Sequence, residues 1–128
     1  MQMQTNHIFI IGAGAIGKAL AVFLKAAGRQ VTLLRGSVEE AERKSELFRV
    51  VLEDETTLEA AVEVAGLSLY QTLEGLVVLA NKSYGNARLA KVLKAKAAGS
   101  PLVLLQNGLG VERAFLREDF AQVYRCVL

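Results

Sequence analysis

Gly12-Ala13-Gly14-Ala15-Ile16-Gly17 is the stretch of this sequence that decides its fold. Its spacing is GxGxxG: the first glycine permits a tight turn, the second lets backbone approach a pyrophosphate, and the third allows a helix to pack closely on a strand. Residues 7–11 before it form an apolar run that predicts a strand. Helical spacing follows it, at Ile16, Ala19, Leu20, Phe23 and Ala27. We favour dinucleotide binding at this turn over a purely structural role.

The helix after the turn supplies the chemistry that a diphosphate needs. Its first backbone N–H groups have no partner within the helix, and its dipole is positive at that end, so an anion binds there without a cationic side chain. Lys18 and Lys25 fall together on the face opposite the apolar one, and Gly28 is placed to close the helix as a left-handed cap.

The middle of the chain departs from a simple alternation of strands and helices. Residues 30–34 predict a second strand, and residues 38–45 are charged and compatible with a helix. Residues 48–52 and 58–64 then alternate apolar with polar, with the acidic residues 53–55 between them as a turn. We expect an antiparallel hairpin inserted at this point.

The second half returns to alternation. Strands are predicted at residues 76–80, 102–105 and 123–128, and helices at 84–98 and 111–116. The expected fold is α/β: a Rossmann-like, doubly wound, mostly parallel sheet with an inserted β-hairpin, in one domain spanning residues 1–128. Since the chain ends on an apolar strand, we expect a domain truncated from a longer protein.

Composition narrows the class of protein. The 128 residues are 52% hydrophobic with one proline, which indicates a packed domain, and the net charge of +2 on scattered side chains gives no case for nucleic acid as a partner. Cys126 is the one cysteine, so an internal disulfide and a cysteine-rich metal site are excluded, and no metal is expected. We expect Cys126 to be an inert core residue.

The N-terminal segment bears on localisation. No basic segment precedes the first apolar run, and Lys18 and Lys25 interrupt the residues after it, so neither a signal peptide nor a membrane span is supported. The single cysteine fits a reducing compartment, and we expect a cytoplasmic protein. A homo-oligomer is allowed but not specified by the sequence.

Residues after the second strand bear on the choice of dinucleotide. NAD-binding proteins usually carry an acid about 20 positions after the glycine motif, where it accepts hydrogen bonds from the ribose hydroxyls. Here no acid stands there, and Arg35 and Ser37 supply a guanidinium and a hydroxyl instead. A charged fork suits a 2′-phosphate, so NADP is predicted. The alternative is that Arg35 is a solvated residue at a strand end.

Two further segments follow predicted strands, at the sheet edge where ligands of open α/β folds bind. Asn81-Lys82-Ser83-Tyr84 contains a lysine that suits a phosphate or carboxylate, and Gln106-Asn107-Gly108-Leu109-Gly110 contains an amide that can orient a nicotinamide or substrate. Taken alone, Lys82 is as well explained as an exposed lysine and Asn107-Gly108 as a common turn. His7 begins a strand at the opposite edge, which argues against a catalytic role.

Taken together, the segments at residues 11–17, 34–35, 82–84 and 105–110, with the inserted hairpin, resemble the ketopantoate reductase (2-dehydropantoate 2-reductase) family. The resemblance covers nearly the whole chain. Two positions depart from it: Asn81 precedes the lysine where an apolar residue is usual, and Gly85 stands where a glutamine is common.

The resemblance implies an enzyme that reduces a 2-oxo acid to its 2-hydroxy acid with NADPH, on the route to pantothenate and coenzyme A. By resemblance, Arg35 would hold the 2′-phosphate, Lys82 would contact the cofactor, and Asn107 would lie where nicotinamide and substrate meet. The family's catalytic lysine and its substrate-carboxylate ligands belong to a following helical domain with no counterpart in this chain. We therefore expect cofactor binding without appreciable turnover.

Two other functions are compatible with the sequence. A regulatory domain that senses a dinucleotide would use the same fold without reacting the nucleotide. Another dehydrogenase family, such as the sugar-nucleotide or hydroxy-acid enzymes, shares a similar first half, although the hairpin and the Lys82 loop argue against it.

Overall fold

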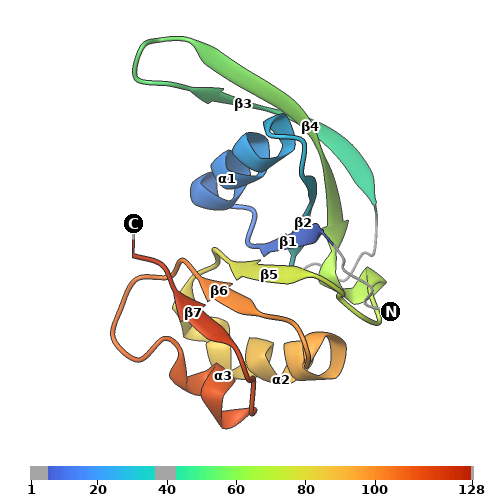
Figure 1. Cartoon of the computed structure of the whole chain (residues 1–128), viewed down its shortest axis with the longest axis vertical. Coiled ribbons are helices and arrows are strands. Elements are labelled where there is room, and N and C mark those ends of the chain that lie inside the picture. The colour runs from blue at the N-terminus through green and yellow to red at the C-terminus, as the bar shows by residue number, and fades with distance from the viewer. Residues whose placement is uncertain (1–5, 37–42, 128) are drawn as a thin grey trace.

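The computed structural model describes residues 6–36 and 43–127, and within them one sheet carries all the strands. Figure 1 shows this sheet with helices on both sides. The strand order is β3-β4-β2-β1-β5-β6-β7. In chain order the elements are β1 (His7–Ile11), α1 (Ala15–Ala26), β2 (Gln30–Arg35), β3 (Lys44–Val51), β4 (Thr57–Gly66), β5 (Leu76–Leu79), α2 (Asn86–Ala97), β6 (Leu102–Leu104), α3 (Arg113–Arg117) and β7 (Val123–Arg125). Two short 3₁₀ turns, η1 (Leu67–Leu69) and η2 (Ser83–Gly85), precede β5 and α2 respectively.

The sheet is mostly parallel and reverses its winding at β1. This strand pairs in parallel with β2 on one side and with β5 on the other, while β3 alone runs antiparallel, against β4. Chain connections therefore leave β1 in opposite directions, which puts helices on both faces. The predicted fold class, an α/β doubly wound sheet of Rossmann type, is confirmed.

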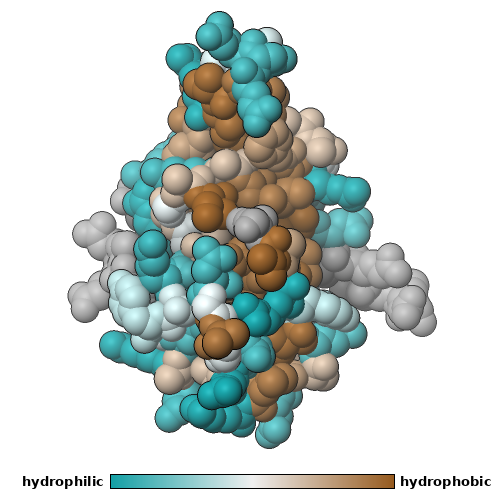
Figure 2. All heavy atoms as spheres, turned by 90° about the vertical axis from the view of Figure 1, so that its left-hand side faces the viewer, coloured by the Kyte–Doolittle hydropathy of each residue, from teal (hydrophilic) through white to brown (hydrophobic). Residues whose placement is uncertain are grey.

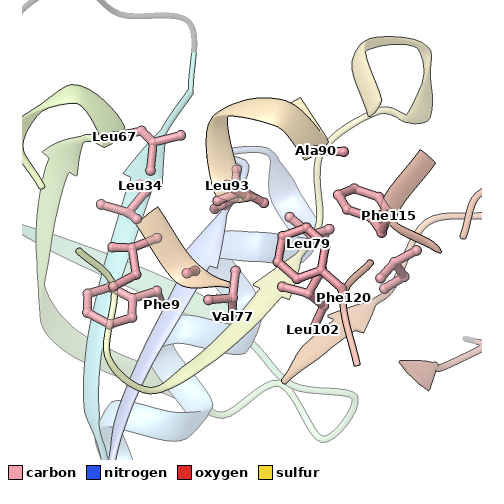
Figure 3. Close-up of a cluster of buried hydrophobic side chains, with 14 of the residues drawn as sticks. Phe9, Leu34, Leu67, Val77, Leu79, Ala90, Leu93, Leu102, Phe115 and Phe120 are labelled. Carbon is pink, nitrogen blue, oxygen red and sulfur yellow. The ribbon is translucent and has the colours of Figure 1, made fainter. Parts of the chain in front are cut away.

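The face of the sheet that carries α2 and α3 holds the larger core. Figure 3 shows aromatic and aliphatic side chains from the strands meeting those of the two helices. Phe9, Leu79, Leu93, Leu102 and Phe115 belong to this cluster and are buried. Full burial of such a side chain contributes about 1.5–3 kcal/mol, so this cluster is the main source of stability on that face.

Helix α1 covers the other face of the sheet. The side chains that it buries there differ from the apolar set predicted from its sequence. Gly17, Ala21 and Val22 are its buried residues, whereas Ile16 and Phe23 remain about half exposed. The expected apolar face was thus partly wrong, because small residues let the helix lie closer to the sheet along the Gly17–Ala21 line. Lys18 does not lie on a free polar face either: its ammonium stands 5.4 Å from the centre of the Phe48 ring of β3.

The end of α1 follows the sequence prediction. Gly28 has φ +84, and its N–H donates to the carbonyl of Lys25 while the N–H of Arg29 donates to that of Leu24. Only a residue without Cβ adopts this left-handed conformation at low cost, so Gly28 ends the helix as predicted.

The predicted hairpin is present, and it is part of the main sheet. β3 and β4 pair over their lengths, from Lys44 opposite Val64 to Val51 opposite Thr57. β4 also pairs in parallel with β2, and Figure 1 shows the hairpin curving over α1. Of the segment expected to be helix-compatible, residues 38–42 lie outside the described residues and Lys44 and Ser45 are in β3, so that interpretation was wrong for this pair.

The last strand is more exposed than its sequence suggests. β7 forms the edge of the sheet beside β6, and Tyr124 and Val127 are largely exposed. Cys126 is an exposed free cysteine, so its expected place in the core was wrong. An apolar pattern predicts a strand but cannot tell whether another layer covers it.

His7 lies at the start of β1, at the opposite edge from the glycine turn. Its Nε2 is 2.8 Å from the hydroxyl of the buried Thr32, and its ring stacks on Phe9 at 4.2 Å. Burial lowers the pKa of His7, and the nearby Glu63 carboxylate only partly offsets this effect. The neutral ring is therefore the form that fits the fold.

This burial predicts a pH dependence of stability. Below the ordinary pKa of about 6.5 the unfolded chain takes up a proton that the folded chain resists, so stability falls as pH drops. The thermal midpoint should be lower at about pH 5.5 than at about pH 7.5. His7→Gln removes the titrating ring and should reduce this difference; an equal difference in both proteins would contradict the assignment.

Candidate functional site

The ends of four neighbouring strands bring the predicted site residues to one edge of the sheet. Because β2, β1, β5 and β6 are parallel neighbours, their carboxyl ends meet at this edge. Arg35 ends its strand there, and Gly12, Lys82 and Asn107 follow theirs. Backbone bonds hold the edge together beyond the strands: Gly12 N–H to Leu34 O (3.0 Å), Ala80 N–H to Ile11 O (2.8 Å) and Leu105 N–H to Leu79 O (2.9 Å). This is where open α/β sheets bind ligands.

Gly12 and Gly17 are required by close packing inside the turn. Gly12 has φ +115, and a Cβ there would lie 2.7 Å from the backbone nitrogen of Asn81. A Cβ on Gly17 would lie 2.1 Å from the carbonyl oxygen of Gly12. Two of the three roles assigned to the motif, the tight turn and the close approach of helix and strand, are therefore seen directly.

Gly14 differs from the other two glycines. It is exposed and extended, and a Cβ built on it would meet no protein atom within 4 Å. Open space beside this backbone is what the remaining role, the approach of a ligand at the second glycine, requires. Within residues 14–17, all of them described, the helix start carries neither an acid nor a side-chain cap. The amides of Ala15 and Ile16, both exposed, stand at the positive end of α1.

Arg35 ends β2 at the same edge, and its guanidinium is engaged. Nη2 lies 3.3 Å from Oε1 of Glu46, and the Arg35 side chain is 35% exposed. Arg35 is therefore held in place by a carboxylate and still reachable from solvent. Ser37, its predicted partner in phosphate binding, lies outside the described residues.

Lys44 and Glu46 of β3 belong to this corner of the site, and the sequence analysis did not identify them. Lys44 Nζ lies 2.9 Å from the same Glu46 oxygen that pairs with Arg35. A hydrogen bond from Lys44 is the main cause that lowers the pKa of Glu46, with further lowering by the charges of Lys44, Arg35 and Lys18. The signal available in the sequence was the alternation of β3, which puts residues 44 and 46 on one face.

A buried group of amides joins the two loops that carry Lys82 and Asn107. Asn86 and Gln106 exchange two hydrogen bonds, from Asn86 Nδ2 to Gln106 Oε1 (2.7 Å) and from Gln106 Nε2 to Asn86 Oδ1 (2.8 Å). Gln106 Nε2 also donates to Oδ1 of Asn81 (3.2 Å), and Asn86 Nδ2 to the carbonyl of Val111. Asn81, which departs from the family pattern, thus has a structural partner here.

Lys82 and Asn107 themselves are exposed at the ends of this connection. Asn81 Nδ2 donates to the carbonyl of Lys82, and Arg125 donates to the carbonyl of Gly108, so the backbone beside each is fixed. Within the described ranges neither side chain has a hydrogen-bonding partner. Both are held at the edge of the sheet with their polar groups available.

Hydrophobic side chains surround this edge. Tyr84 and Leu109, next to the Lys82 and Asn107 loops, are 94% and 99% exposed. Figure 2 faces the side of Figure 1 toward which β5 and β7 point, and it shows hydrophobic surface over α1 and the hairpin below a hydrophilic hairpin tip. Ile16, Leu47 and Val51 are the large exposed apolar residues of these elements besides Phe23. The loops that carry Lys82 and Asn107 thus each present a large apolar side chain to solvent.

A hollow of about 850 Å³ lies at the opposite edge of the sheet. His7, Arg43, Glu63 and Tyr70 are among the residues that line it. Arg43 pairs with Glu63 at 3.1 Å, and the Tyr70 hydroxyl donates to the same carboxylate at 3.1 Å, so these groups satisfy one another. The glycine turn, with its uncapped amides, is the stronger candidate for a binding site.

The described residues contain neither a metal-binding cluster nor a membrane-spanning helix. Across residues 6–36 and 43–127 no three or more His, Cys, Asp or Glu side chains gather as a metal ion would require. In those same ranges no helix has the length and hydrophobicity to cross a membrane.

Comparison with known sequences gives a family. Residues 8–128 match the family model described as ketopantoate reductase PanE/ApbA. A 2-dehydropantoate 2-reductase of Halobacterium salinarum is 33% identical over 105 residues, which are 81% of this chain and 35% of that protein. The chain thus spans about a third of the length of this curated relative.

Comparison with solved structures supports the fold. A dimeric ketopantoate reductase of Staphylococcus aureus superposes with a TM-score of 0.69 at 20% identity, over 95% of this chain and 43% of that one. A D-mandelate dehydrogenase solved with NADH and anilino(oxo)acetate gives 0.69 at 21% identity, over 93% and 39%. At these identities the likeness establishes a shared architecture.

The glycine geometry predicts that two alanine substitutions in one motif have different effects. Gly17→Ala forces a methyl group into the Gly12 carbonyl and should destabilise the fold by about 1–3 kcal/mol or more. Gly14→Ala adds a methyl group in open space at an ordinary φ of −79 and should leave the thermal midpoint nearly unchanged. Thermal unfolding of both variants provides the measurement, and equal losses would contradict the packing described.

Proposed function

The chain belongs to the ketopantoate reductase family, and from that premise we propose that it is the NADP-binding domain of a cytoplasmic NADPH-dependent 2-oxo acid reductase. The substrate we propose is 2-dehydropantoate, reduced to pantoate on the route to pantothenate and coenzyme A. The observation that carries the cofactor assignment is the pairing of an uncapped, acid-free helix start with a solvent-accessible arginine at the end of the next strand. A diphosphate and a further phosphate require these two features at one edge of a sheet.

The residues present fit a nicotinamide dinucleotide. We assign the diphosphate to the backbone of Gly12, Ala13, Gly14, Ala15, Ile16 and Gly17. Open space beside Gly14 and the helix start of α1, which has no side-chain cap among the described residues, support this assignment. No cationic side chain is needed there, because the helix dipole and the amides together stabilise the negative charge.

The choice of NADPH over NADH depends on Arg35. Its guanidinium offers a planar fork that suits a phosphate bidentately, and 35% of the side chain remains exposed. Lys44 adds a second cation 2.9 Å from the carboxylate that Arg35 also contacts. These charges favour a dianionic phosphate on the adenosine ribose.

We assign the nicotinamide end to the loops after β5 and β6. Lys82 is a cation for a cofactor phosphate, and Asn107 orients the nicotinamide or the substrate. The buried Asn86–Gln106 pair supports this assignment, since it fixes both loops relative to each other. When bound, NADPH supplies the hydride, and the chain's own groups bind and orient it.

Reduction requires more than these groups. A 2-oxo acid needs a donor of the proton that the new alkoxide takes, a partner for its carboxylate and a site closed against water. Tyr84 and Leu109 stand almost fully exposed beside Lys82 and Asn107, which suits a surface completed by further residues. We propose that the remaining groups come from the part of the relatives' length that this chain does not span, and that the assembled enzyme is a homo-oligomer.

Cofactor preference tests the role of Arg35. Arg35→Ala should weaken NADPH binding about 10-fold to 100-fold, the loss expected for a bidentate charge-assisted contact, and should change NADH binding much less. Titration of both proteins with both nucleotides gives the four dissociation constants. Equal losses for the two nucleotides would contradict a phosphate contact, and binding of neither by folded wild type would overturn the proposed function.

A turnover assay tests whether this chain binds the cofactor but needs further residues for reduction. The 128-residue chain should bind NADPH yet oxidise it no faster in the presence of 2-dehydropantoate than in its absence, because we propose that the proton donor for the alkoxide comes from the part of the relatives' length that this chain does not span. Loss of NADPH absorbance is the readout, with the Halobacterium salinarum relative as positive control. Robust reduction by these residues alone would contradict the proposal, whereas binding without activity even when the rest of the protein is present would favour a sensing role.

A further inference from the structure

An acidic side chain stands at the proposed adenosine end of the site, although β2 itself ends on Arg35 and not on an acid. Glu46 comes from β3, two strands away from β2, yet its Oε1 lies 3.3 Å from Nη2 of Arg35. In the register Arg35 lies beside Gly66 of β4, whereas Glu46 lies opposite Val62 of the same strand, so the two long side chains meet diagonally across β4. The hairpin therefore supplies the acid that dinucleotide-binding sheets usually carry at the end of their second strand.

The carboxylate has two cations within reach. Lys44, two residues before Glu46 on the same face of β3, lies 2.9 Å from the same oxygen that Arg35 contacts. These three side chains together carry a net charge of +1, and Lys18 on α1 adds its field. Glu46 can therefore release Arg35 and stay paired through Lys44.

We propose that Glu46 sets the dinucleotide preference of this site: its carboxylate competes with a ribose 2′-phosphate for Arg35 and accepts a hydrogen bond from the ribose hydroxyl when that phosphate is missing. This inference rests on the proposed function, because it names the selectivity of the same binding site. It makes the domain a moderate discriminator that binds NADPH better than NADH and accepts both.

The energetic consequences have opposite signs for the two nucleotides. A 2′-phosphate must displace Glu46 from Arg35 and then lies near its negative charge, so Glu46 weakens NADPH binding. A 2′-hydroxyl donates to an ionised carboxylate in a charge-assisted bond, so Glu46 strengthens NADH binding. Lys44 limits the first effect by holding the displaced carboxylate.

The test compares Glu46→Gln with wild type and with a matched control. Glu59→Gln makes the same change of charge on the same hairpin, where Glu59 pairs with Arg49 rather than with Arg35. The fluorescence of bound NADPH and NADH, in a chain without tryptophan, gives each dissociation constant. The ratio of the NADH constant to the NADPH constant should rise about tenfold in Glu46→Gln and stay constant in Glu59→Gln.

Each outcome bears on a distinct claim. If wild type binds NADPH and the ratio in Glu46→Gln is unchanged or falls, this inference is overturned while the proposed function stands. A rise of equal size in Glu59→Gln would also overturn it, since the effect would then be one of overall charge. If folded wild type binds neither nucleotide, the proposed function fails and the inference with it.

A second variant tests the part played by Lys44. Lys44→Met should weaken NADPH binding several-fold, because the displaced carboxylate loses its other partner, and this loss should shrink when combined with Glu46→Gln. An undiminished loss in the double variant would overturn the role of Lys44 as the alternative partner of Glu46. Thermal midpoints of all variants exclude unfolding as the cause.

Discussion

The contact of the Gly17 backbone with the Gly12 carbonyl is the constraint on which the rest of the site depends. It brings the start of α1 so close to the end of β1 that Gly17 cannot carry a Cβ, while the backbone of Asn81 leaves no room for one on Gly12. That closeness places the first turn of α1 directly beyond the carboxyl end of β1, the central strand of the sheet. If the helix lay farther from β1, its first-turn amides would not converge on one position, and the proposed diphosphate site would not form.

A buried, uncharged pair of amide side chains, Asn86 and Gln106, holds the loops after β5 and β6 in place. The two hydrogen bonds between Asn86 and Gln106 are buried, and breaking either would leave an amide unsatisfied, at a cost of about 1–3 kcal/mol. The pair therefore joins the loops after β5 and β6 more firmly than exposed ion pairs would. Lys82 and Asn107 are exposed, but their neighbours Asn81 and Gln106 belong to the hydrogen-bonded group that includes the buried Asn86.

The β3–β4 hairpin is an integral part of the main sheet and not a separate insertion. By joining β2 in parallel through β4, it extends the sheet and covers the flank of α1, where Phe48 meets Lys18. It also brings Lys44 and Glu46 to Arg35. The charges at the proposed adenosine end thus come from two strands, β2 and β3, of which only β2 belongs to the ordinary nucleotide-binding unit.

The sequence by itself determined the order of elements, the turn at residues 12–17, the cap at Gly28 and the strand-end positions of Arg35, Lys82 and Asn107. These follow from local rules of periodicity, backbone freedom and chain direction. Only the tertiary structure decided which face of α1 is buried, that Cys126 is exposed, and that Glu46 lies beside Arg35. Each of these depends on which distant part of the chain packs against a segment. The pattern of residues within the segment does not specify that partner.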